Sequence, residues 1–239
     1  GLKTTNFKIM TNDNKQHKLS DSTDTAIDYS TCCVSGADFG GLISLYNEDC
    51  LQALKRYDDN HFDIAIVDPP YGIGISRNPF RQKFEKCDWD NAIPNKQYFD
   101  ELMRVSKNQI IWGGNYFDLP PSQGFLIWDK KQPQGFSSAM CEMAWMSLQK
   151  PAKIFRKHVV TAEPNKIHPT QKPVDLYKWL LINYTNENDL ILDTHLGSGS
   201  IAIACWELKR KLVGFEINKG YYDNACKRLE DKTRILTLW

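Results

Sequence analysis

Short apolar runs alternate with amphipathic segments from about residue 43 to residue 230. The apolar runs predict strands at 62–67, 109–112, 125–128, 142–148, 190–192 and 212–216. Helical spacing of apolar residues predicts helices at 49–57, 96–106, 173–184, 200–210 and 219–230. This alternation predicts an α/β fold: a doubly wound, mostly parallel sheet with helices on both faces. In such sheets ligands bind beyond the carboxyl ends of the strands, so the residues that follow each strand are the first candidates for chemistry.

Residues 1–40 lack this pattern and are rich in Ser, Thr, Asn and Asp, which predicts a polar N-terminal extension before a single domain at 41–239. The chain has 239 residues, of which 41% are hydrophobic, so a globular core is expected. No apolar run reaches the roughly 18 residues of a membrane span, and no secretory leader is evident. Seven cysteines without a CxxC pair favour reduced thiols and no metal site. We therefore expect a soluble cytoplasmic protein.

Basic residues are concentrated in two segments, although the net charge is only +1. One cluster contains Arg77, Arg81, Lys83 and Lys86. Between 130 and 172 the acidic residues are Glu142 and Glu163, and the more numerous basic residues are Lys130, Lys131, Lys150, Lys153, Arg156, Lys157, Lys166 and Lys172. These side chains could neutralise phosphates, and a solvated face is an equally good interpretation.

A stiff acidic corner follows the predicted strand at 62–67, in the sequence Asp68-Pro69-Pro70-Tyr71. The two prolines cannot continue a strand ladder, and each fixes its own φ angle. The corner aims two acceptors, the Asp68 carboxylate and the Pro69 carbonyl, at one point beside the flat ring of Tyr71. A planar group that carries an NH2 fits such a site, since two acceptors would draw electron density back to a delocalised amine nitrogen. An ordinary turn with a surface tyrosine is the alternative for this segment alone.

A glycine-rich turn follows the predicted strand at 190–192. Asp193 ends the strand, and Gly197 and Gly199 precede the next predicted helix, so a ligand could approach the backbone there. With Ala202 the segment also fits a dinucleotide fingerprint, and Glu216 at the end of the next strand could accept ribose hydroxyls in either case. The glycines alone are compatible with a simple packing turn.

Three segments together resemble one family. DPPYG at 68–72, HPTQKPVDL at 168–176 and LDTHLGSGS at 192–200, in that order, resemble the amino-group (N6-adenine/N4-cytosine) DNA methyltransferases of β-type motif order. The resemblance covers about residues 43–230. It implies a Rossmann-like S-adenosylmethionine-dependent methyltransferase fold with a small inserted recognition region. The chain departs from the family pattern at Thr194 and His195, where a proline and a phenylalanine are usual.

The resemblance also implies site residues. Asp68, Pro69, Pro70 and Tyr71 would hold a flipped target base. The cofactor S-adenosylmethionine would be bound by a larger set, made up of Asp49, Cys50, His168, Thr170, Lys172, Asp193, Leu196, Gly197, Gly199 and Glu216. In this set Lys172 would face the cofactor carboxylate. A buried thiol for Cys50 and a structural role for His168 are equally good interpretations.

The expected reaction is direct methyl transfer to an exocyclic nitrogen of a base extruded from double-stranded DNA, with no covalent enzyme intermediate. Adenine N6 is the first choice because Asp at the first motif position mostly accompanies adenine in the family. The alternatives are cytosine N4, a non-catalytic subunit that binds nucleic acid, a methyltransferase of RNA or protein glutamine, and a nicotinamide dehydrogenase. The intact DPPY segment argues against a non-catalytic subunit, and the motif order argues against a methyltransferase of RNA or protein glutamine.

Sequence recognition is expected in segments 130–165 and 77–90, where aromatic residues such as Phe80, Trp89 and Phe136 are interleaved with basic ones. For any one of these aromatic residues, a position in the hydrophobic core is at least as good an interpretation. Few residues are left for a recognition domain, so we expect a short DNA site or help from a second subunit in a homodimer.

Overall fold

The computed structural model describes residues 8–9, 35–74, 92–133, 135, 139–158, 168 and 170–236. Ten strands form one sheet in the order β1-β2-β3-β10-β9-β4-β5-β7-β6-β8. The strands are β1 (Lys8–Ile9), β2 (Ser35–Phe39), β3 (Ile43–Asn47), β4 (Ile64–Val67), β5 (Gln109–Trp112), β6 (Phe125–Asp129), β7 (Cys141–Met146), β8 (Lys153–Arg156), β9 (Leu190–Asp193) and β10 (Lys211–Phe215). The helices are α1 (Cys50–Leu54), α2 (Lys96–Val105), α4 (Val174–Tyr184), α5 (Ser200–Glu207) and α6 (Lys219–Leu236), with a short 3-10 turn η3 (Gly114–Tyr116).

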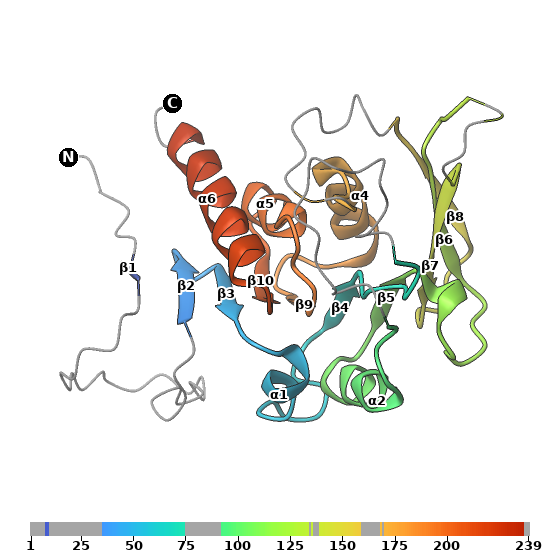
Figure 1. Cartoon of the computed structure of the whole chain (residues 1–239), viewed down its shortest axis with the longest axis horizontal. Helices are drawn as coiled ribbons and strands as arrows, with labels where there is room; N and C mark the ends of the chain where they lie inside the picture. Colours follow the sequence, from blue (N-terminus) through green and yellow to red (C-terminus); the bar gives the residue numbers. More distant parts are fainter. Residues whose placement is uncertain are drawn as a thin grey trace.

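The centre of the sheet is parallel and both of its faces are covered. Five central strands run parallel to one another, in the order β3, β10, β9, β4 and β5. Beyond β5, β7 and then β6 continue the sheet in antiparallel pairs. Helices α4, α5 and α6 lie on one face and α1 and α2 on the other (Figure 1). The predicted doubly wound α/β fold is confirmed, with an antiparallel extension that the sequence pattern did not indicate.

The core has two parts, one on each face of the sheet. Ile66 of β4 belongs to the cluster under α4, α5 and α6, whereas its neighbours Ala65 and Val67 belong to the cluster under α1 and α2. This division follows from the strand geometry, because successive side chains point to opposite faces. All four residues of β4 are buried, which explains why its sequence reads as an uninterrupted apolar run.

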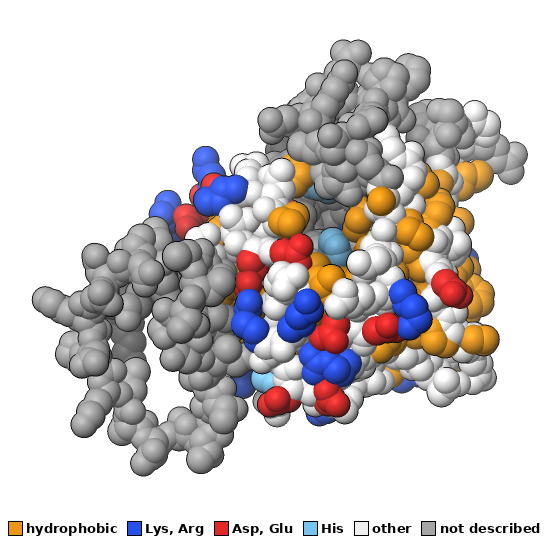
Figure 2. Space-filling model, turned by 60° about the horizontal axis from the view of Figure 1, so that its bottom comes forward, with side chains coloured by type: hydrophobic (Ala, Val, Ile, Leu, Met, Phe, Trp, Pro, Cys, Tyr) orange, Lys and Arg blue, Asp and Glu red, His pale blue; other side chains and the backbone are white. Residues whose placement is uncertain are grey.

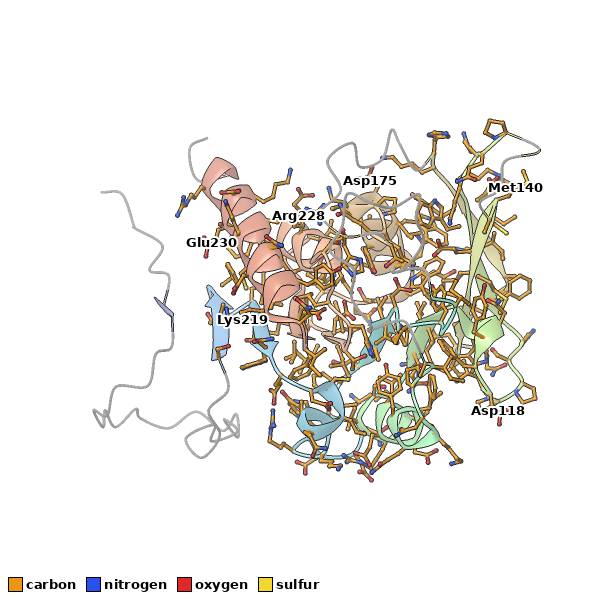
Figure 3. The ribbon with its side chains drawn as sticks, viewed as in Figure 1. Asp118, Met140, Asp175, Lys219, Arg228 and Glu230 are labelled. Carbon is orange, nitrogen blue, oxygen red and sulfur yellow. The ribbon has the colours of Figure 1, made fainter. Side chains whose placement is uncertain are left out.

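Contacts between the helices fix the glycine-rich turn from behind. Arg228 of α6 lies on the side of that helix that faces α5 (Figure 3), and its guanidinium donates to the Ser198 carbonyl at 3.0 Å and to Ser200 Oγ at 2.9 Å. The turn between β9 and α5 is therefore attached to α6 as well as to the sheet.

The sheet begins before residue 40. β2 pairs antiparallel with β3, with Phe39 opposite Ile43, so Ser35–Phe39 joins the sheet although the sequence assigned it to the polar extension. β1 pairs with β2, and the other residues of the extension before 35 lie outside the described residues. The boundary at residue 41 itself stays a prediction.

Candidate active site

The acidic corner after β4 is closed by its own tyrosine. Tyr71 Oη donates a hydrogen bond of 2.6 Å to Asp68 Oδ1. Burial and the charge of Asp68 raise the pKa of Tyr71 well above its usual value, so the hydroxyl keeps its proton and remains a donor. The Tyr71 ring stacks on Tyr116, with centroids 5.0 Å apart and an interplanar angle of 12°. Pro69 is buried behind this corner, whereas Pro70 is half-buried.

The other oxygen of Asp68 contacts Lys172, which lies two residues before α4 begins at Val174. Lys172 Nζ lies 2.5 Å from Asp68 Oδ2 and 3.1 Å from Oε2 of Glu142, a residue of β7. Burial raises the pKa of Asp68, and the Lys172 ammonium is the largest influence that opposes this effect. The structure thus places Lys172 between two carboxylates, and its expected contact with a cofactor carboxylate stays a prediction.

The glycine-rich turn connects β9 to α5 and holds an acidic side chain from β10. Gly197 has a φ of +52°, and its N–H donates to Glu216 Oε2 at 2.8 Å. The N–H of Asn218 donates to the other oxygen of Glu216 at 2.9 Å. Burial raises the pKa of Glu216, and these backbone donors oppose that rise. Each carboxylate oxygen still has a lone pair for a further donor.

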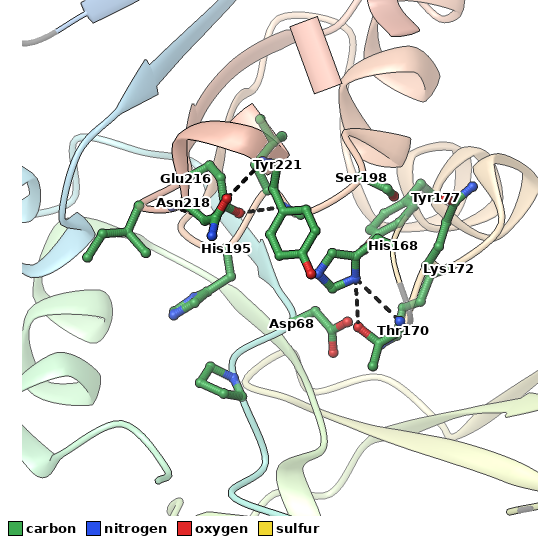
Figure 4. Close-up of a pocket in the computed structure, with 15 residues that line it drawn as sticks. Asp68, His168, Thr170, Lys172, Tyr177, His195, Ser198, Glu216, Asn218 and Tyr221 are labelled. Carbon is green, nitrogen blue, oxygen red and sulfur yellow. Dashed lines mark hydrogen bonds and ion pairs between the residues drawn. The ribbon is translucent and has the colours of Figure 1, made fainter. Parts of the chain in front are cut away.

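One cavity of about 230 Å³ joins the two motifs. Figure 4 shows Asp68 and Lys172 on one side of it and Glu216 with Asn218 on the other, with His168 and Tyr221 between them. In the space-filling view a hollow with a histidine side chain opens on the surface, with hydrophobic side chains gathered beside it (Figure 2). The carboxyl ends of β4 and β10 therefore face one shared space, as expected for ligand binding in a parallel sheet.

The cavity brings together only part of the predicted site. Of the predicted residues, the lining contains Asp68, Pro70, His168, Thr170, Lys172, Leu196, Gly197 and Glu216. Pro69, Tyr71, Asp49, Cys50, Asp193 and Gly199 are not in it. Asp193 is only 2% exposed, and burial raises its pKa to about 8.

Asp49 and Cys50 lie where β3 leads into α1. The Asp49 carboxylate accepts a hydrogen bond from the N–H of Gln52 at 3.1 Å and so caps α1. Burial, followed by the Asp49 charge, raises the pKa of Cys50 to about 12. A thiol with so high a pKa is not a nucleophile at neutral pH. The Cys50 side chain is half-buried, and its expected contact with the cofactor stays a prediction.

The two positions that depart from the family pattern form a hydrogen-bonded unit. Thr194 Oγ1 lies 2.9 Å from His195 Nδ1 and 2.7 Å from the hydroxyl of Tyr98 on α2. The His195 ring lines the cavity and packs edge-on against Tyr98. Burial lowers the pKa of His195 to about 4, so the imidazole is neutral at physiological pH.

The His168 ring is oriented by its neighbours. The backbone N–H of Thr170 lies 3.3 Å from His168 Nδ1, and because an N–H can only donate, Nδ1 is an acceptor. This leaves Nε2 as the ring nitrogen that carries a hydrogen. His168 also packs edge-on against Tyr221 of α6, with centroids 4.4 Å apart.

Several lining residues were missed by the sequence analysis. They are Gln171, Tyr177, His195, Ser198, Ile217, Asn218 and Tyr221. Two signals could have found most of them. Gln171 lies inside the HPTQKP segment, and the residues after Glu216 follow a strand end, where chemistry was expected. Glu142 is not a lining residue, and no local signal marks it.

The segments expected to recognise DNA are described only in part. Segment 77–90 lies outside the described residues. In segment 130–165 the described residues build β7 and β8, and three basic residues pair with acidic ones: Lys130 with Glu142, Arg156 with Asp129, and Lys157 with Asp175. Their contact with phosphates stays a prediction.

The described residues hold neither a metal cluster nor a membrane-spanning helix. No group of three or more His, Cys, Asp or Glu side chains could hold a metal ion in that part of the chain. None of the helices described there is both long and apolar enough for a membrane span.

The chain is similar to DNA methylases. Residues 111–227 match the family model N6/N4 methylase, described as DNA methylase. The chain is 26% identical over 242 residues to the type II methyltransferase M.HpaI of Haemophilus parainfluenzae, an alignment that covers 77% of this chain and 73% of that protein. It is 24% identical to the type II methyltransferase M.BglII of Bacillus subtilis, with 79% of this chain and 69% of that protein covered.

Two crystal structures share the fold. The M1.HpyAVI–SAM complex has a TM-score of 0.54 at 22% identity and covers 79% of this chain and 100% of that one. PvuII DNA methyltransferase (cytosine-N4-specific) has a TM-score of 0.53 at 12% identity, with 82% and 93% covered. The fold is that of the Rossmann-like methyltransferases. The segment 111–227 thus resembles the N6/N4 DNA methylases, and the curated relatives M.HpaI and M.BglII are type II methyltransferases.

Proposed function

We propose that this chain transfers a methyl group from S-adenosylmethionine to the N6 amine of an adenine that is flipped out of double-stranded DNA. One observation carries the proposal: Asp68 from the acidic corner and Glu216 beside the glycine-rich turn line the same cavity. A donor bound at the turn and an amine bound at the corner would therefore meet in one space.

The residues at the turn fit this cofactor. The Glu216 carboxylate, held by the N–H groups of Gly197 and Asn218, offers acceptors for ribose hydroxyls. Gly197 brings backbone rather than a side chain to the cavity. Three further residues of the proposed cofactor site line the same space: His168, Thr170 and Leu196. The proposed site also includes four residues outside the lining: Asp193, Gly199, Asp49 and Cys50. The M1.HpyAVI neighbour was crystallised as a complex with SAM. S-Adenosylmethionine supplies a methyl group already activated by a positively charged sulfur.

The acidic corner would act on the amine. Asp68 accepts a hydrogen from the exocyclic NH2, which localises electron density on the nitrogen and favours its attack on the methyl carbon. The Pro69 carbonyl is the second proposed acceptor, and the Tyr71 ring is the proposed stacking surface. The buried Tyr71 hydroxyl fixes the Asp68 carboxylate through its 2.6 Å hydrogen bond. Positioning and polarisation of this kind supply several kcal/mol without a metal.

Adenine is preferred over cytosine because the residue at the first motif position is Asp68, which in the resembled family mostly accompanies adenine. The type II relatives support a role in restriction-modification in a bacterial cytoplasm. Segments 130–165 and 77–90 are the proposed recognition segments, and the homodimer stays a prediction.

The test is the variant Asp68→Ala. We expect methyl transfer to DNA to fall at least ~10³-fold, since removal of a single transition-state hydrogen-bonding group alone costs about 10²–10³. Cofactor affinity, measured by isothermal titration calorimetry, should stay within a few-fold of wild type. Glu142 still pairs with Lys172 in this variant, so the ammonium is not left alone. Asp118→Ala is the matched control, because Asp118 is an exposed aspartate that does not line the cavity.

Mass spectrometry of nucleosides after the reaction identifies the target. N6-methyladenine alone supports the adenine assignment, and N4-methylcytosine alone would replace it with the cytosine one. Near-normal turnover by Asp68→Ala would contradict the proposed role of the acidic corner whichever base is modified.

A further inference from the structure

The ammonium of Lys172 is enclosed at the boundary between the parallel and antiparallel parts of the sheet. Its side chain is only 3% exposed. It lies 2.5 Å from Asp68 Oδ2, 3.1 Å from Glu142 Oε2 and 3.3 Å from the Tyr71 hydroxyl. The ring centroids of Trp112 and Tyr71 are 5.3 Å and 5.8 Å from Nζ, so two aromatic rings also contact the cation.

Glu142 is in turn held by a second cation. Lys130 Nζ lies 2.6 Å from Glu142 Oε1, and the Lys130 side chain is 13% exposed. Burial alone would raise the pKa of Glu142, but Lys172 and Lys130 outweigh it and hold that pKa at about 2. These contacts form an alternating row of negative and positive charges, which we call the charge row: Asp68, Lys172, Glu142 and Lys130.

Both oxygens of Asp68 are occupied in this arrangement, by Tyr71 on Oδ1 and by Lys172 on Oδ2. Among the described residues, the other titratable groups that face Asp68 are Tyr177 of α4, Asp193 of β9 and His168 in the cavity lining. Lys172 is therefore the cation that most strongly opposes the rise that burial causes in the pKa of Asp68. An amine that donates to Oδ2 must share this oxygen with the ammonium.

We propose that Lys172 and Glu142 are positioning residues of the methyl-transfer site: Lys172 fixes the Asp68 carboxylate through its contact with Oδ2, and Glu142 holds Lys172 when the target amine takes up that oxygen. This proposal rests on the proposed function for the identity of the amine. Neither residue contacts the reacting atoms in this scheme.

The physical reason lies in the shared ammonium. When an amine donates to Oδ2, it reduces the attraction of that oxygen for Lys172. Without Glu142 the buried ammonium would lose part of its compensation, which is costly in a water-poor site. With Glu142 3.1 Å away, the ammonium stays paired, and Lys130 anchors Glu142 from the other side.

The experiment measures the Asp68 carboxyl directly. Protein labelled with 13C at the Asp carboxyl carbons is titrated by NMR, and the Asp68 signal is assigned by its loss in Asp68→Asn. In Lys172→Met we expect the pKa of Asp68 to rise by about 1–3 units, because an opposite charge within hydrogen-bond distance lowers a carboxyl pKa by that amount. In Glu142→Gln we expect it to fall, since a like charge is removed.

The pH profile of kcat should follow the same two directions. The acidic limb should move to higher pH in Lys172→Met and to lower pH in Glu142→Gln, with kcat in Glu142→Gln reduced at the plateau because Lys172 then competes more strongly for Asp68. Lys172→Arg should restore the wild-type limb. Lys178→Met is the matched control, since Lys178 of α4 also pairs with a glutamate, Glu207 of α5, and neither residue belongs to the charge row.

Shifts in opposite directions are the result that a purely structural ion pair would not give. An unmoved Asp68 titration in Lys172→Met, or movement in the same direction in both variants, would overturn the proposal. So would a tenfold or larger loss of cofactor affinity in Lys172→Met with the Asp68 titration unchanged, which would assign Lys172 to the cofactor carboxylate. If Lys172→Met does not fold, Glu142→Gln and Lys172→Arg decide. Absence of DNA methylation by the wild type would refute the proposed function, while the NMR titration would still test the charge row.

Discussion

Gly113 offers a direct test of whether the placement of Tyr71 controls catalysis. It follows β5 with a φ of +71° and lies directly against the tyrosine of the acidic corner. A Cβ atom built on Gly113 would lie 2.2 Å from Cε1 and 2.6 Å from Cδ1 of Tyr71. Gly113→Ala would therefore push the ring away from its present position.

The size of the effect follows from two contributions. A left-handed φ costs an alanine about 1–2 kcal/mol, wherever it occurs. The clash adds a further cost: an ordinary contact begins near 3.4 Å, so the ring must move by roughly 1.2 Å, the difference from 2.2 Å. Overpacking of this kind costs about 1–3 kcal/mol more. Since Tyr71 Oη holds Asp68 at 2.6 Å, the carboxylate must follow the ring or lose the bond.

The expected outcome is a fall in kcat of about 10²-fold, because misplacement by about 1 Å in an active site can cost that much. This equals about 2.7 kcal/mol in activation free energy. The assay transfers a labelled methyl group to DNA under saturating cofactor, and thermal denaturation reports stability. Gly41→Ala is the matched control, since Gly41 has the same left-handed geometry, with a φ of +70°, and no atom within 4 Å of its added Cβ.

The comparison of the two variants gives the answer. Gly41→Ala should lower Tm modestly and leave kcat within about twofold of wild type, because its strain does not reach the site. If Gly113→Ala lowered Tm no more than Gly41→Ala and kept a normal kcat, the inference that Gly113 positions Tyr71 and Asp68 would be wrong.

Two further predictions concern pH and stability. Burial raises the pKa of Asp193 to about 8, so Asp193 holds a proton in the folded protein that it releases near pH 4 in the unfolded chain. The stability of the wild type should therefore decline as pH rises from about 4 to 8. The Tm of Asp193→Asn relative to wild type should increase over that range and then level off. His195 should give the opposite pH dependence, because burial lowers its pKa to about 4. Below about pH 6.5 the unfolded chain binds a proton at His195 that the folded protein does not, so stability is lost as pH falls from 6.5 to 4. Replacement by phenylalanine, His195→Phe, should flatten this decline in urea titrations at pH 7 and pH 5, and an unchanged slope would show that His195 is not buried in neutral form.

The buried strands and the helix positions were predictable from the sequence because their patterns report burial directly. β4 and β5 are buried throughout and appear as apolar runs at 62–67 and 109–112. The exposed edge strand β8, the largely polar β2 and the central strand β3 were missed, as was the short strand β1. β8 has only one residue that is not exposed, so its hydrophobic pattern carries no signal, and its strand conformation comes from pairing with β6.

The site was predictable to the extent that it depends on strand ends. Asp68, Gly197 and Glu216 were found from their positions after predicted strands, and the structure brings them to one cavity. The partners of Lys172 were not predictable in this way. Glu142 lies within a strand, 30 residues before Lys172 in the chain, and only the three-dimensional pairing of β7 with β5 places it near the acidic corner.

The antiparallel extension explains how Glu142 reaches the acidic corner. In the parallel part, Asp68 follows β4 at its carboxyl end, the edge where β5 ends at Trp112. β7 runs the other way, with Ala144 opposite Trp112, so Glu142, the second residue of β7, lies at this same edge.

β6 reverses direction again and ends at Asp129, which brings Lys130 to that edge beside Glu142. The hairpin of β6 and β7 therefore adds one acidic and one basic side chain at the edge where the parallel strands end. A change in the register of β7 by one residue would turn Glu142 to the opposite face of the sheet and break the charge row, although every residue of the acidic corner and the glycine-rich turn would remain. The charged neighbours of the acidic corner thus depend on the register of β7 as much as the corner depends on its own sequence.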